Sequence, residues 1–561
     1  MKKWVYKDVS VTKTNELSDT AGIGWLFAYL LIGRGIETVD EVKEFVYPNF
    51  NLMYDPFLLN DMDKAVSRIK TAVNLGEKIT VYGDYDVDGL TSTAIILDML
   101  EIMGVKADVY IPDRIHEGYG LNKDALKQIA NNGCKLIITV DLGATAIEEI
   151  EYGNSLGLEF VVTDHHQLLE RLPEALAIVN PHRDDCPYPF KNLAGVGVAF
   201  KLATAVLSDK YDSKVVLQRY YDLLSLGTIS DIVSLTGENR LYTKYGLKHF
   251  SNTCNVGLKT LLKLTGFDNS VINETSIGYG LGPRINSAGR MGKVETALNL
   301  LISKNINEAE YFAGQLCEMN ASRKSIEQDI FLQAEKQIAE FENIDNIIVV
   351  YSKNWHTGII GIVASRLVEI HSRPVIILSV DDNGICHGSG RSIRNFNLFD
   401  SLTYCSSLLE KYGGHEMAVG LTIKENNILE FIKAINNYAS IVIDEDMLVP
   451  YLEIDYEADP TEITIDLAEK LKFFEPYGQD NPKPIFSMRN MEVISCNETR
   501  DGKHLRMHCS SMGKHFWCIG FNMAQEKPAV GSIIDLAFNL DINEYNNTKD
   551  ISLVIKDIHK H

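Results

Sequence analysis

Three apolar runs in the first half of the chain each end in acidic or histidine residues, and this pattern limits the folds open to the sequence. Residues 79–82 lead into Gly83-Asp84-Tyr85-Asp86-Val87-Asp88-Gly89, residues 136–140 into Asp141-Leu142-Gly143, and residues 160–163 into Asp164-His165-His166. Short apolar runs bounded by turn residues predict buried strands. Because ligands bind at the carboxyl ends of strands in an open α/β sheet, the sequence predicts a parallel sheet with these side chains gathered at one edge.

The alternating aspartates Asp84, Asp86 and Asp88 indicate a cation site. Carboxylates held close together repel one another and raise each other's pKa unless cations neutralise them. A solvated acidic turn is the simplest alternative. A calcium loop of the EF-hand type is excluded, because its twelfth position is Ile95, where a bidentate Glu is required.

A fourth acidic candidate, Asp231, follows the apolar-rich segment 223–229. Taken singly, Asp141 or Asp231 could cap a turn or a helix, and His165 and His166 could be surface or packed histidines. Their joint occurrence favours a metal site, and carboxylates with imidazole suit manganese or magnesium better than a thiolate-selective metal. The nine cysteines form no C-x-x-C pair, which favours reduced thiols over a zinc site or a disulfide framework.

Length and charge set further limits. A chain of 561 residues is long enough for about three or four domains. Its net charge of −22 argues against a broadly basic nucleic-acid binder, but a nuclease with an acidic metal site and a local basic groove is compatible with it. The first residues carry no extended apolar stretch, and the apolar patch 25–32 is too short to span a bilayer. We therefore expect a cytoplasmic protein without a membrane segment.

The chain divides into five expected segments, which differ in their patterns of apolar and turn residues. An N-terminal segment, 1–60, precedes alternating strand and helix patterns over 61–245, which predict the parallel sheet. Residues 246–345 predict a helical connector, with one long helix over 307–342. A second α/β unit with Gly-rich loops at 388–392 and 413–420 occupies 346–449. Short strands with turns at 501–502 and 543–547 predict a small β-barrel over 450–561.

The expected barrel mixes basic and aromatic residues: Lys503, Arg506, Lys514, Lys527, Phe516, Trp517 and Phe521. Such a mixture suits attraction to a nucleic-acid backbone together with base stacking. The alternative is that the aromatic residues form the barrel core and the lysines are solvated edge residues.

The motifs together resemble a known superfamily. The strings 83–89, 141–143, 163–166 and 227–231 resemble the DHH phosphoesterases, and the strings 180–189, 193–201 and 282–291 narrow the resemblance to the RecJ family of single-strand-specific 5′-to-3′ DNA exonucleases. The resemblance extends over nearly the whole chain, from residues 30–36 onward. It implies a parallel-sheet DHH catalytic domain, a helical connector, a second α/β DHH-associated domain that binds substrate, and a C-terminal oligonucleotide-binding β-barrel.

The resemblance also implies a reaction: hydrolysis of phosphodiester bonds in single-stranded DNA by two manganese or magnesium ions, in repair and recombination. The ions would activate a water molecule and neutralise charge on the transition state. The implied metal ligands are Asp84, Asp86, Asp88, Asp141, His165 and Asp231. His166 is expected to contact phosphate or support the ligands, and Asp164 to orient a ligand histidine. Some superfamily members carry His where this chain has Tyr82, which leaves open which aspartate binds which ion.

Further residues are implied in binding DNA. Arg114, Ser389 and Arg391 would hold a 5′-terminal phosphate, Arg284 and Arg290 would contact the backbone further along, and His415 lies in the second Gly-rich string. A guanidinium can grip a phosphate with two hydrogen bonds. The alternative for Arg391 is a surface arginine beside a glycine turn, and turns are also the simplest explanation of the Gly-rich strings themselves.

Two other functions stay open. A phosphodiesterase of the same superfamily could act on short oligonucleotides or cyclic dinucleotides, although a small substrate needs no long strand-binding surface. A catalytically silent DNA-binding scaffold would be expected to have lost the metal-binding residues, which are present here. Single-stranded DNA is the expected partner, with a single-strand binding protein and a RecQ-type helicase as candidates.

Overall fold

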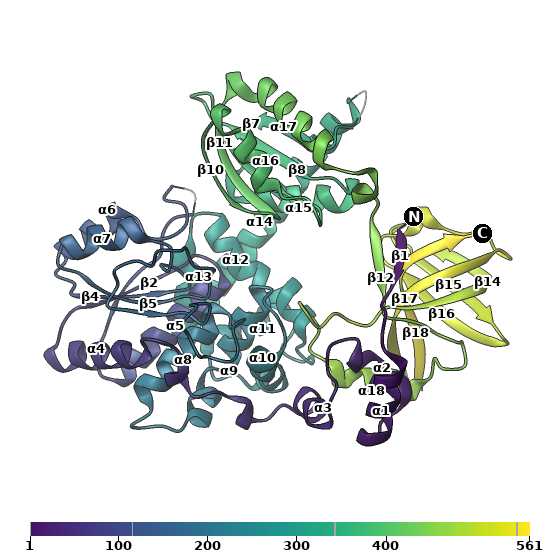
Figure 1. Cartoon of the computed structure of the whole chain (residues 1–561), viewed down its shortest axis with the longest axis horizontal. Helices are drawn as coiled ribbons and strands as arrows, with labels where there is room; N and C mark the ends of the chain where they lie inside the picture. Colours follow the sequence, from purple (N-terminus) through teal and green to yellow (C-terminus); the bar gives the residue numbers. More distant parts are fainter. Residues whose placement is uncertain (1, 115, 342–343, 546–547) are drawn as a thin grey trace. The chain divides into compact units, whose positions relative to one another are not determined.

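The computed structural model describes residues 2–114, 116–341, 344–545 and 548–561, and these group into two compact units (Figure 1). The first unit combines the N-terminal segment up to Met53 with Ile232–Lys244 and Pro450–His561. The second contains Tyr54–Asp231 and Tyr245–Val449.

The second unit begins with a five-stranded parallel sheet in the order β3-β2-β4-β5-β6. Its central strands β2, β4 and β5 pair in register, so that Gly83, Val140 and Thr163 lie side by side. The predicted parallel sheet is therefore confirmed, and the residues that follow these strands start from the same edge. The five strands are β2 (Ile79–Gly83), β3 (Asp108–Tyr110), β4 (Leu136–Val140), β5 (Glu159–Thr163) and β6 (Ala177–Val179).

Helices cover both faces of this sheet, which explains why its central strands are apolar on both sides. On one face Ile137 and Phe160 pack with Leu126 and Ile150 from α6 and α7. Figure 1 shows α6 and α7 above the sheet, with α4, α5 and α8 below it. The helices are α4 (Met62–Leu75), α5 (Val87–Ile102), α6 (Lys123–Asn131), α7 (Ile147–Ser155), α8 (Gly195–Leu207) and α9 (Ser213–Ser230).

The following region is helical, as predicted. The helix expected over 307–342 is α14, which begins after the N-cap Asn305 and has 34 residues; position 342 lies outside the described residues. A π-helical turn, η4, leads directly into α12. The elements are α10 (Gly237–His249), α11 (Val256–Thr265), η4 (Ser276–Leu281), α12 (Gly282–Arg290), α13 (Val294–Ile302) and α14 (Ile306–Ala339).

A second sheet, in the order β10-β11-β9-β8-β7, follows α14. The Gly-rich strings 388–392 and 413–420 were expected to be loops, and that expectation is wrong, because most of their residues belong to β9, β10 and β11. A Cβ on Gly388 would lie 2.5 Å from the Leu378 side chain, so glycine is needed for packing across the sheet. The elements are β7 (Ile348–Lys353), α15 (Thr357–His371), β8 (Val375–Val380), β9 (Ile385–Arg391), α16 (Leu398–Tyr404), β10 (Leu409–His415), β11 (Ala418–Lys424) and α17 (Ile428–Val442).

The first unit contains the predicted barrel. Its strands follow the order β14-β15-β16-β18-β17, and pairing of β17 with β14 closes the sheet. The turn expected at 501–502 lies between β14 and β15; of the turn expected at 543–547, residues 543–545 belong to β17, and 546–547 lie outside the described residues. The strands are β14 (Phe486–Glu498), β15 (Leu505–Ser511), β16 (Lys514–Gly520), β17 (Ile533–Tyr545) and β18 (Thr548–Lys560).

The N-terminal segment belongs to the same unit as the barrel. Strand β1 (Lys3–Tyr6) pairs in parallel with β12 (Tyr451–Ile454). Apolar residues of α2 (Trp25–Ile32) and α3 (Val39–Val46) join the barrel core. The unit also contains α1 (Val11–Ala21), β13 (Tyr456–Glu457) and α18 (Ile465–Leu471). None of the helices in the described part of the chain is both long and apolar enough to cross a membrane.

Candidate active site

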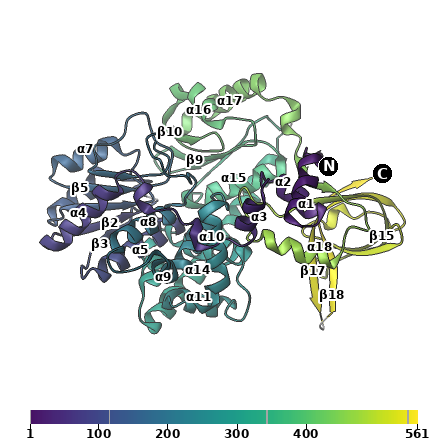
Figure 2. The same ribbon diagram turned by 60° about the horizontal axis from the view of Figure 1, so that its bottom comes forward.

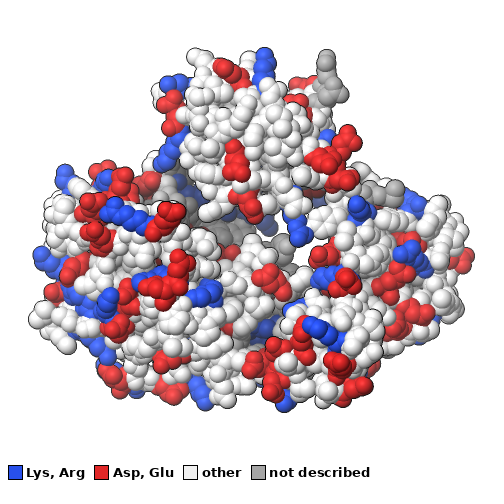
Figure 3. All heavy atoms as spheres, viewed as in Figure 1, with Lys and Arg blue, Asp and Glu red and all other residues white. Residues whose placement is uncertain are grey.

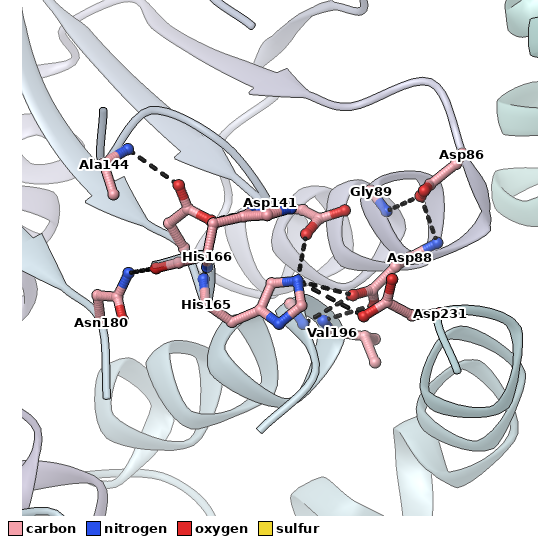
Figure 4. A network of polar contacts seen from close by, with 12 residues as sticks. Asp86, Asp88, Gly89, Asp141, Ala144, His165, His166, Asn180, Val196 and Asp231 are labelled. Atoms are coloured by element: carbon pink, nitrogen blue, oxygen red, sulfur yellow. Dashed lines mark hydrogen bonds and ion pairs between the residues drawn. The ribbon is translucent and has the colours of Figure 1, made fainter. Parts of the chain in front are cut away.

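The carboxyl ends of β2, β4 and β5 place Asp84, Asp141 and Asp164 next to one another at one edge of the sheet. Figure 4 shows Asp141 directed toward His165, Asp88 and Asp231. Asp141 has a φ of 63°, in the left-handed region that residues with a side chain rarely adopt. Backbone strain of this kind is concentrated at functional sites, where it directs a side chain.

The other two aspartates of the first motif lie at the start of α5, so the expected turn is limited to residues 84–86. Asp86 is the N-cap of α5, and its carboxylate accepts hydrogen bonds from the Asp88 and Gly89 N–H groups. Asp88 is buried in the first turn and accepts from Gly195 N at 2.7 Å and Val196 N at 2.8 Å. These two donors form the N-terminus of α8, which favours negative charge.

Asp231 lies near the other aspartates but follows a helix rather than a strand. The apolar segment before it forms the last turns of α9, and Asp231 is the C-cap residue of that helix. Its Oδ2 lies 3.5 Å from His165 Nε2. The helical periodicity was hidden in the sequence because α9 is buried over most of its C-terminal half.

His165 lies at the centre of the acidic group. Its Nε2 is 3.1 Å from Asp141 Oδ1 and 3.8 Å from Asp88 Oδ2 (Figure 4). Burial, followed by the neighbouring His166, lowers the pKa of His165 to about 4, so the ring is neutral at pH 7. A neutral imidazole carries one N–H at most and cannot neutralise several carboxylates. The convergent lone pairs therefore favour a bound cation.

The aspartates of the site have raised pKa values, as expected for carboxylates that are buried close together. Burial, followed by repulsion from the other aspartates, raises the pKa of Asp84, Asp141 and Asp231 well above the usual range and that of Asp88 to about 7. Asp84 Oδ1 and Asp231 Oδ2 are buried without a hydrogen-bond partner. The oxygen and imidazole donors suit manganese or magnesium. Three sets of donors lie close enough to hold an ion: Asp84, Asp86 and Asp141; Asp88, His165 and Asp231; and Asp141, His165 and His166.

Asp164 is paired with His166 rather than with His165. Its Oδ1 lies 2.7 Å from His166 Nδ1 and also accepts from the His165 and His166 N–H groups, while Oδ2 accepts from Ala144 N. Burial raises the pKa of Asp164, but the hydrogen bond from His166, the charges of both histidines and the hydrogen bond from Ala144 N together outweigh burial, and the net pKa is lowered. Burial lowers the pKa of His166, but Asp164 together with the charges of Asp84 and Asp88 outweighs burial, and the net pKa is raised. The pairing with Asp164 thus fixes the orientation of the His166 ring.

Two glycines make room for this arrangement. A Cβ on Gly195 would lie 2.5 Å from Asp141 Oδ1, and one on Gly227 would lie 2.5 Å from Thr91 Oγ1 and 2.9 Å from Asp88 Oδ1. Any other residue at these positions would displace the carboxylates. Gly195 also supplies an N–H to Asp88, so its backbone is part of the site.

A group of arginines lies near the acidic site. The Arg114 guanidinium lies 5.0 Å from the centre of the Tyr85 ring, and Arg391 donates to Ser389 Oγ at 3.1 Å. Burial, followed by repulsion from Arg114, Arg323 and Arg391, lowers the pKa of Arg290 to about 10. Figure 3 shows Lys and Arg interspersed with Asp and Glu on the visible face of this acidic chain. The mutual repulsion of Arg114, Arg290, Arg323 and Arg391 marks a local concentration of positive charge. Such a concentration favours an anionic ligand.

The other two residues expected to contact DNA, Arg284 and His415, differ in their surroundings. Arg284 donates to Gly280 O at 2.6 Å, and its Nε is buried without a hydrogen-bond partner. His415 is exposed at the end of β10, and within the described residues no contact joins it to the arginines. The structure therefore brings Arg114, Arg290, Ser389 and Arg391 together but leaves His415 apart.

Several residues that sequence reasoning missed support the site. Tyr119 lies 3.3 Å from His166 Nδ1 through its hydroxyl, Asn180 donates to His166 O, and Asn286 accepts from Val87 N. Arg323 on α14 lies close enough to affect Arg290. Asn180 and Asn286 lie in the strings 180–189 and 282–291, on which the family resemblance rests, so the sequence could have indicated that they belong to the site. Tyr119 and Arg323 follow no local pattern that would separate them from surface residues.

Comparisons with known proteins agree with this geometry. The model of the DHH family N-terminal domain matches residues 78–228, that of the DHHA1 domain 345–440, and that of the RecJ OB domain 454–557. The single-stranded-DNA-specific exonuclease RecJ of Bacillus subtilis is 38% identical over 99% of this chain and 70% of its own length. The Escherichia coli protein of the same name is 33% identical over 95% of each chain.

Solved structures give the same result. The crystal structure of RecJ from Thermus thermophilus in complex with Mn²⁺ matches with a TM-score of 0.86 and 27% identity, over all of this chain and 80% of that one. A second structure, of exonuclease RecJ bound to manganese, matches 70% of this chain and 97% of its own with a TM-score of 0.62 and 32% identity. With the sequence relatives matching over nearly its full length, the chain belongs to the RecJ family of the DHH superfamily.

Proposed function

We propose that this chain is a metal-dependent exonuclease that hydrolyses single-stranded DNA. The observation that carries the proposal is the convergence of Asp84, Asp88, Asp141, His165 and Asp231, where buried side-chain atoms of Asp84, Asp141, His165 and Asp231 have no hydrogen-bond partner. Family membership supports the substrate, since the relatives are named single-stranded-DNA-specific exonucleases.

The proposed metal ligands are Asp84, Asp86, Asp88, Asp141, His165 and Asp231, and two ions, Mn²⁺ or Mg²⁺, are the proposed cofactors. Bound ions would lower the pKa of a water molecule and neutralise negative charge on the phosphate oxygens in the transition state. The protein holds the proposed ligands in place: Gly195 and Val196 N–H groups fix Asp88, and Asp164 fixes the ring of His166. The proposed role of His166 is to donate a proton or hydrogen bond to that phosphate.

The direction of digestion is proposed to be 5′ to 3′. Arg114, Ser389 and Arg391 would form the pocket for a 5′-terminal phosphate, whose negative charge would relieve the repulsion among the buried guanidinium groups. Arg284 and Arg290 would contact the backbone beyond it. His415 is retained only as a weaker candidate, because its exposed position joins none of these groups in the described structure.

The broader context is also proposed. The five segments keep the boundaries 1–60, 61–245, 246–345, 346–449 and 450–561, the location is the cytoplasm, and a single-strand binding protein and a RecQ-type helicase are candidate partners. The small-nucleotide phosphodiesterase is the second candidate function, and the closed barrel disfavours it because a dinucleotide does not need a second binding surface.

The test compares initial rates with Mn²⁺ on end-labelled single strands, duplexes and dinucleotides. We expect single strands to be degraded fastest, from the 5′ end, and a 5′-phosphate to be preferred over a 5′-hydroxyl. Arg391→Ala should remove most of that preference and Arg391→Lys should restore little, since a point charge lacks the two-pronged grip. Arg284→Ala, the matched control, should slow both strands alike. Digestion from the 3′ end, or unchanged discrimination in Arg391→Ala, would refute the pocket; fast turnover of dinucleotides alone would favour the second candidate.

A further inference from the structure

The loop that carries Arg114 is held by one carboxylate that has no part in the metal site. We call residues 113–114 and 116–120, which lie between β3 and α6, the Arg114 loop. Glu117 Oε1 accepts from the Tyr110 hydroxyl at 2.6 Å and from Asn122 Nδ2 at 3.1 Å. Its Oε2 accepts from Asp113 N at 2.6 Å. One side chain therefore ties together the end of β3, the start of the loop and the N-cap of α6.

The backbone of the loop needs such an anchor. Gly118 and Gly120 have φ angles of 84° and 92°, in the left-handed region that favours glycine. Because glycine has the greatest conformational freedom of all residues, two glycines this close together do little to fix the loop by themselves. Glu117 N and Gly118 N both donate to Asp113 O, at 2.8 Å and 3.1 Å, and close a tight turn on either side of Arg114 and Glu117.

Tyr82 supplies a second anchor, at the other end of the loop. It lies on β2, opposite Tyr110 of the edge strand β3 (Figure 2). Its ring is fully buried, and the ring centres of Tyr82 and Tyr110 lie 4.9 Å apart. The Tyr82 hydroxyl donates to Gly120 O at 3.2 Å and accepts from Asn122 Nδ2 at 3.3 Å. Asn122 thus joins the two anchors, because its side chain contacts both Tyr82 and Glu117.

The anchored loop presents two side chains to the site. The Tyr119 hydroxyl lies 3.3 Å from His166 Nδ1. Arg114 lies close enough to Arg290 and Arg391 to repel both guanidinium groups. Like charges disfavour this position of Arg114, so contacts elsewhere in the loop must outweigh the repulsion when no anion is bound.

We infer that Glu117 is a positioning residue whose carboxylate holds the Arg114 loop so that Arg114 faces the pocket proposed for the 5′-terminal phosphate. This inference rests on the proposed function and names a residue that determines how its substrate's end is recognised. Within the described residues, the hydrogen-bond partners of the Glu117 carboxylate all belong to the loop and its two flanks, so its effect reaches the substrate through Arg114. A guanidinium held in place before the substrate arrives loses less entropy on binding it.

The test uses the full chain with Mn²⁺ and measures kcat/KM on matched single strands that carry a 5′-phosphate or a 5′-hydroxyl. Glu117→Ala should lower kcat/KM on the phosphorylated strand by about 10- to 100-fold, the effect of a small misplacement of a binding group, and on the hydroxyl strand much less. Glu117→Gln should lie between wild type and Glu117→Ala, because the amide keeps only one of the two acceptor oxygens. Glu148→Ala is the matched control: Glu148 is an exposed glutamate on α7 whose carboxylate lies 3.1 Å from Lys123 Nζ, and the variant should behave as wild type.

A double-mutant cycle separates positioning from a general loss of structure. In the Arg114→Ala background, adding Glu117→Ala should change the preference for a 5′-phosphate no further, because Glu117 acts through Arg114. Additive losses overturn the inference, as does wild-type discrimination in Glu117→Ala from an active enzyme that prefers the phosphorylated strand.

Limited trypsin digestion in EDTA follows the loop without relying on activity. Cleavage after Arg114, scored by mass spectrometry, should be faster in Glu117→Ala than in wild type and Glu148→Ala, because a released loop opens more readily to the protease. An unchanged rate at Arg114 overturns the inference even if the enzyme is inactive. An inactive wild type, or one without preference for a 5′-phosphate, contradicts the proposed function, and faster cleavage in Glu117→Ala would then still support the anchoring of the loop by Glu117.

Discussion

At the residue scale, the candidate metal centre combines features that each cost stability, namely buried carboxylates close to one another and a strained backbone. Asp84 and Asp141 are buried near other carboxylates, and Asp141 adopts a left-handed backbone conformation. The sequence predicted these residues because three of the four motifs follow strands of one sheet, whose ends must meet. It did not predict that Asp164 pairs with His166, because adjacent histidines are equivalent in a sequence and only the turn after β5 decides which ring faces the carboxylate.

Asp141→Ala and His165→Ala are predicted to reduce the rate of DNA cleavage on the order of a thousandfold or more, because each removes a proposed metal ligand, and the bound ions would stabilise charge in the transition state. Melting temperature should fall little or rise, since one source of buried repulsion disappears. Asp108→Ala, at an exposed position on β3, is the control and should leave the rate unchanged. A variant of Asp141 or His165 with wild-type turnover would contradict the assignment.

Metal binding is predicted to release protons. The raised pKa values mean that the metal-free centre holds protons that the unfolded chain, with a usual Asp pKa of about 3.9, would have lost. Their contribution to stability is therefore present at low pH and is lost as the pH rises through the folded-state pKa, which is about 7 for Asp88. Mn²⁺ replaces those protons, so it should raise the melting temperature more at pH 8 than at pH 6. Calorimetry in two buffers of different ionisation enthalpy measures the release; a buffer-independent heat would contradict it.

At the element scale, helix starts and glycines position the site as much as the strands do. The strand–turn pattern after β2 and β4 was predictable, but Asp88 and Asp231 come from the two ends of helices. The Gly-rich strings were misinterpreted as loops because a glycine that avoids a clash across a sheet looks the same in a sequence as one that permits a turn. Distinguishing the two requires knowledge of the partner strand.

Gly195→Ala is predicted to abolish activity without unfolding the protein. Alanine in α8 should favour the helix by up to about 1 kcal/mol over glycine, but its Cβ would lie 2.5 Å from Asp141 Oδ1 and displace the carboxylate. Gly197→Ala, two residues later in the same helix, meets only the Leu193 side chain at 3.1 Å and is the matched control. Equal activity of the two variants, measured beside their melting temperatures, would show that the space at Gly195 does not matter.

At the scale of the whole molecule, the first unit joins segments from opposite ends of the chain. β1 pairs with β12, some 450 residues away, and Arg240 donates to backbone carbonyls of Phe45 and Phe474. The sequence predicted the barrel from its local strand pattern. It could not predict that the N-terminal segment joins the barrel unit, because pairing between segments distant in the chain leaves no periodic signal in the sequence.

Because the N-terminal segment packs in the same unit as the barrel, a substitution in the core of that segment is predicted to lower the stability of the barrel. Phe27 on α2 is buried with its ring 5.0 Å from that of Phe474, so Phe27→Ala should cost about 3–5 kcal/mol of stability in the first unit. Tyr47→Ala, at an exposed position in the same segment, is the control and should cost much less. Thermal unfolding should then show an earlier transition, and long single strands should bind more weakly. Mn²⁺ should still stabilise the second unit, because the proposed metal ligands all lie between Asp84 and Asp231. The prediction that the first unit unfolds separately from the second is contradicted if both variants have the same melting temperatures, or if Phe27→Ala removes the stabilisation by Mn²⁺.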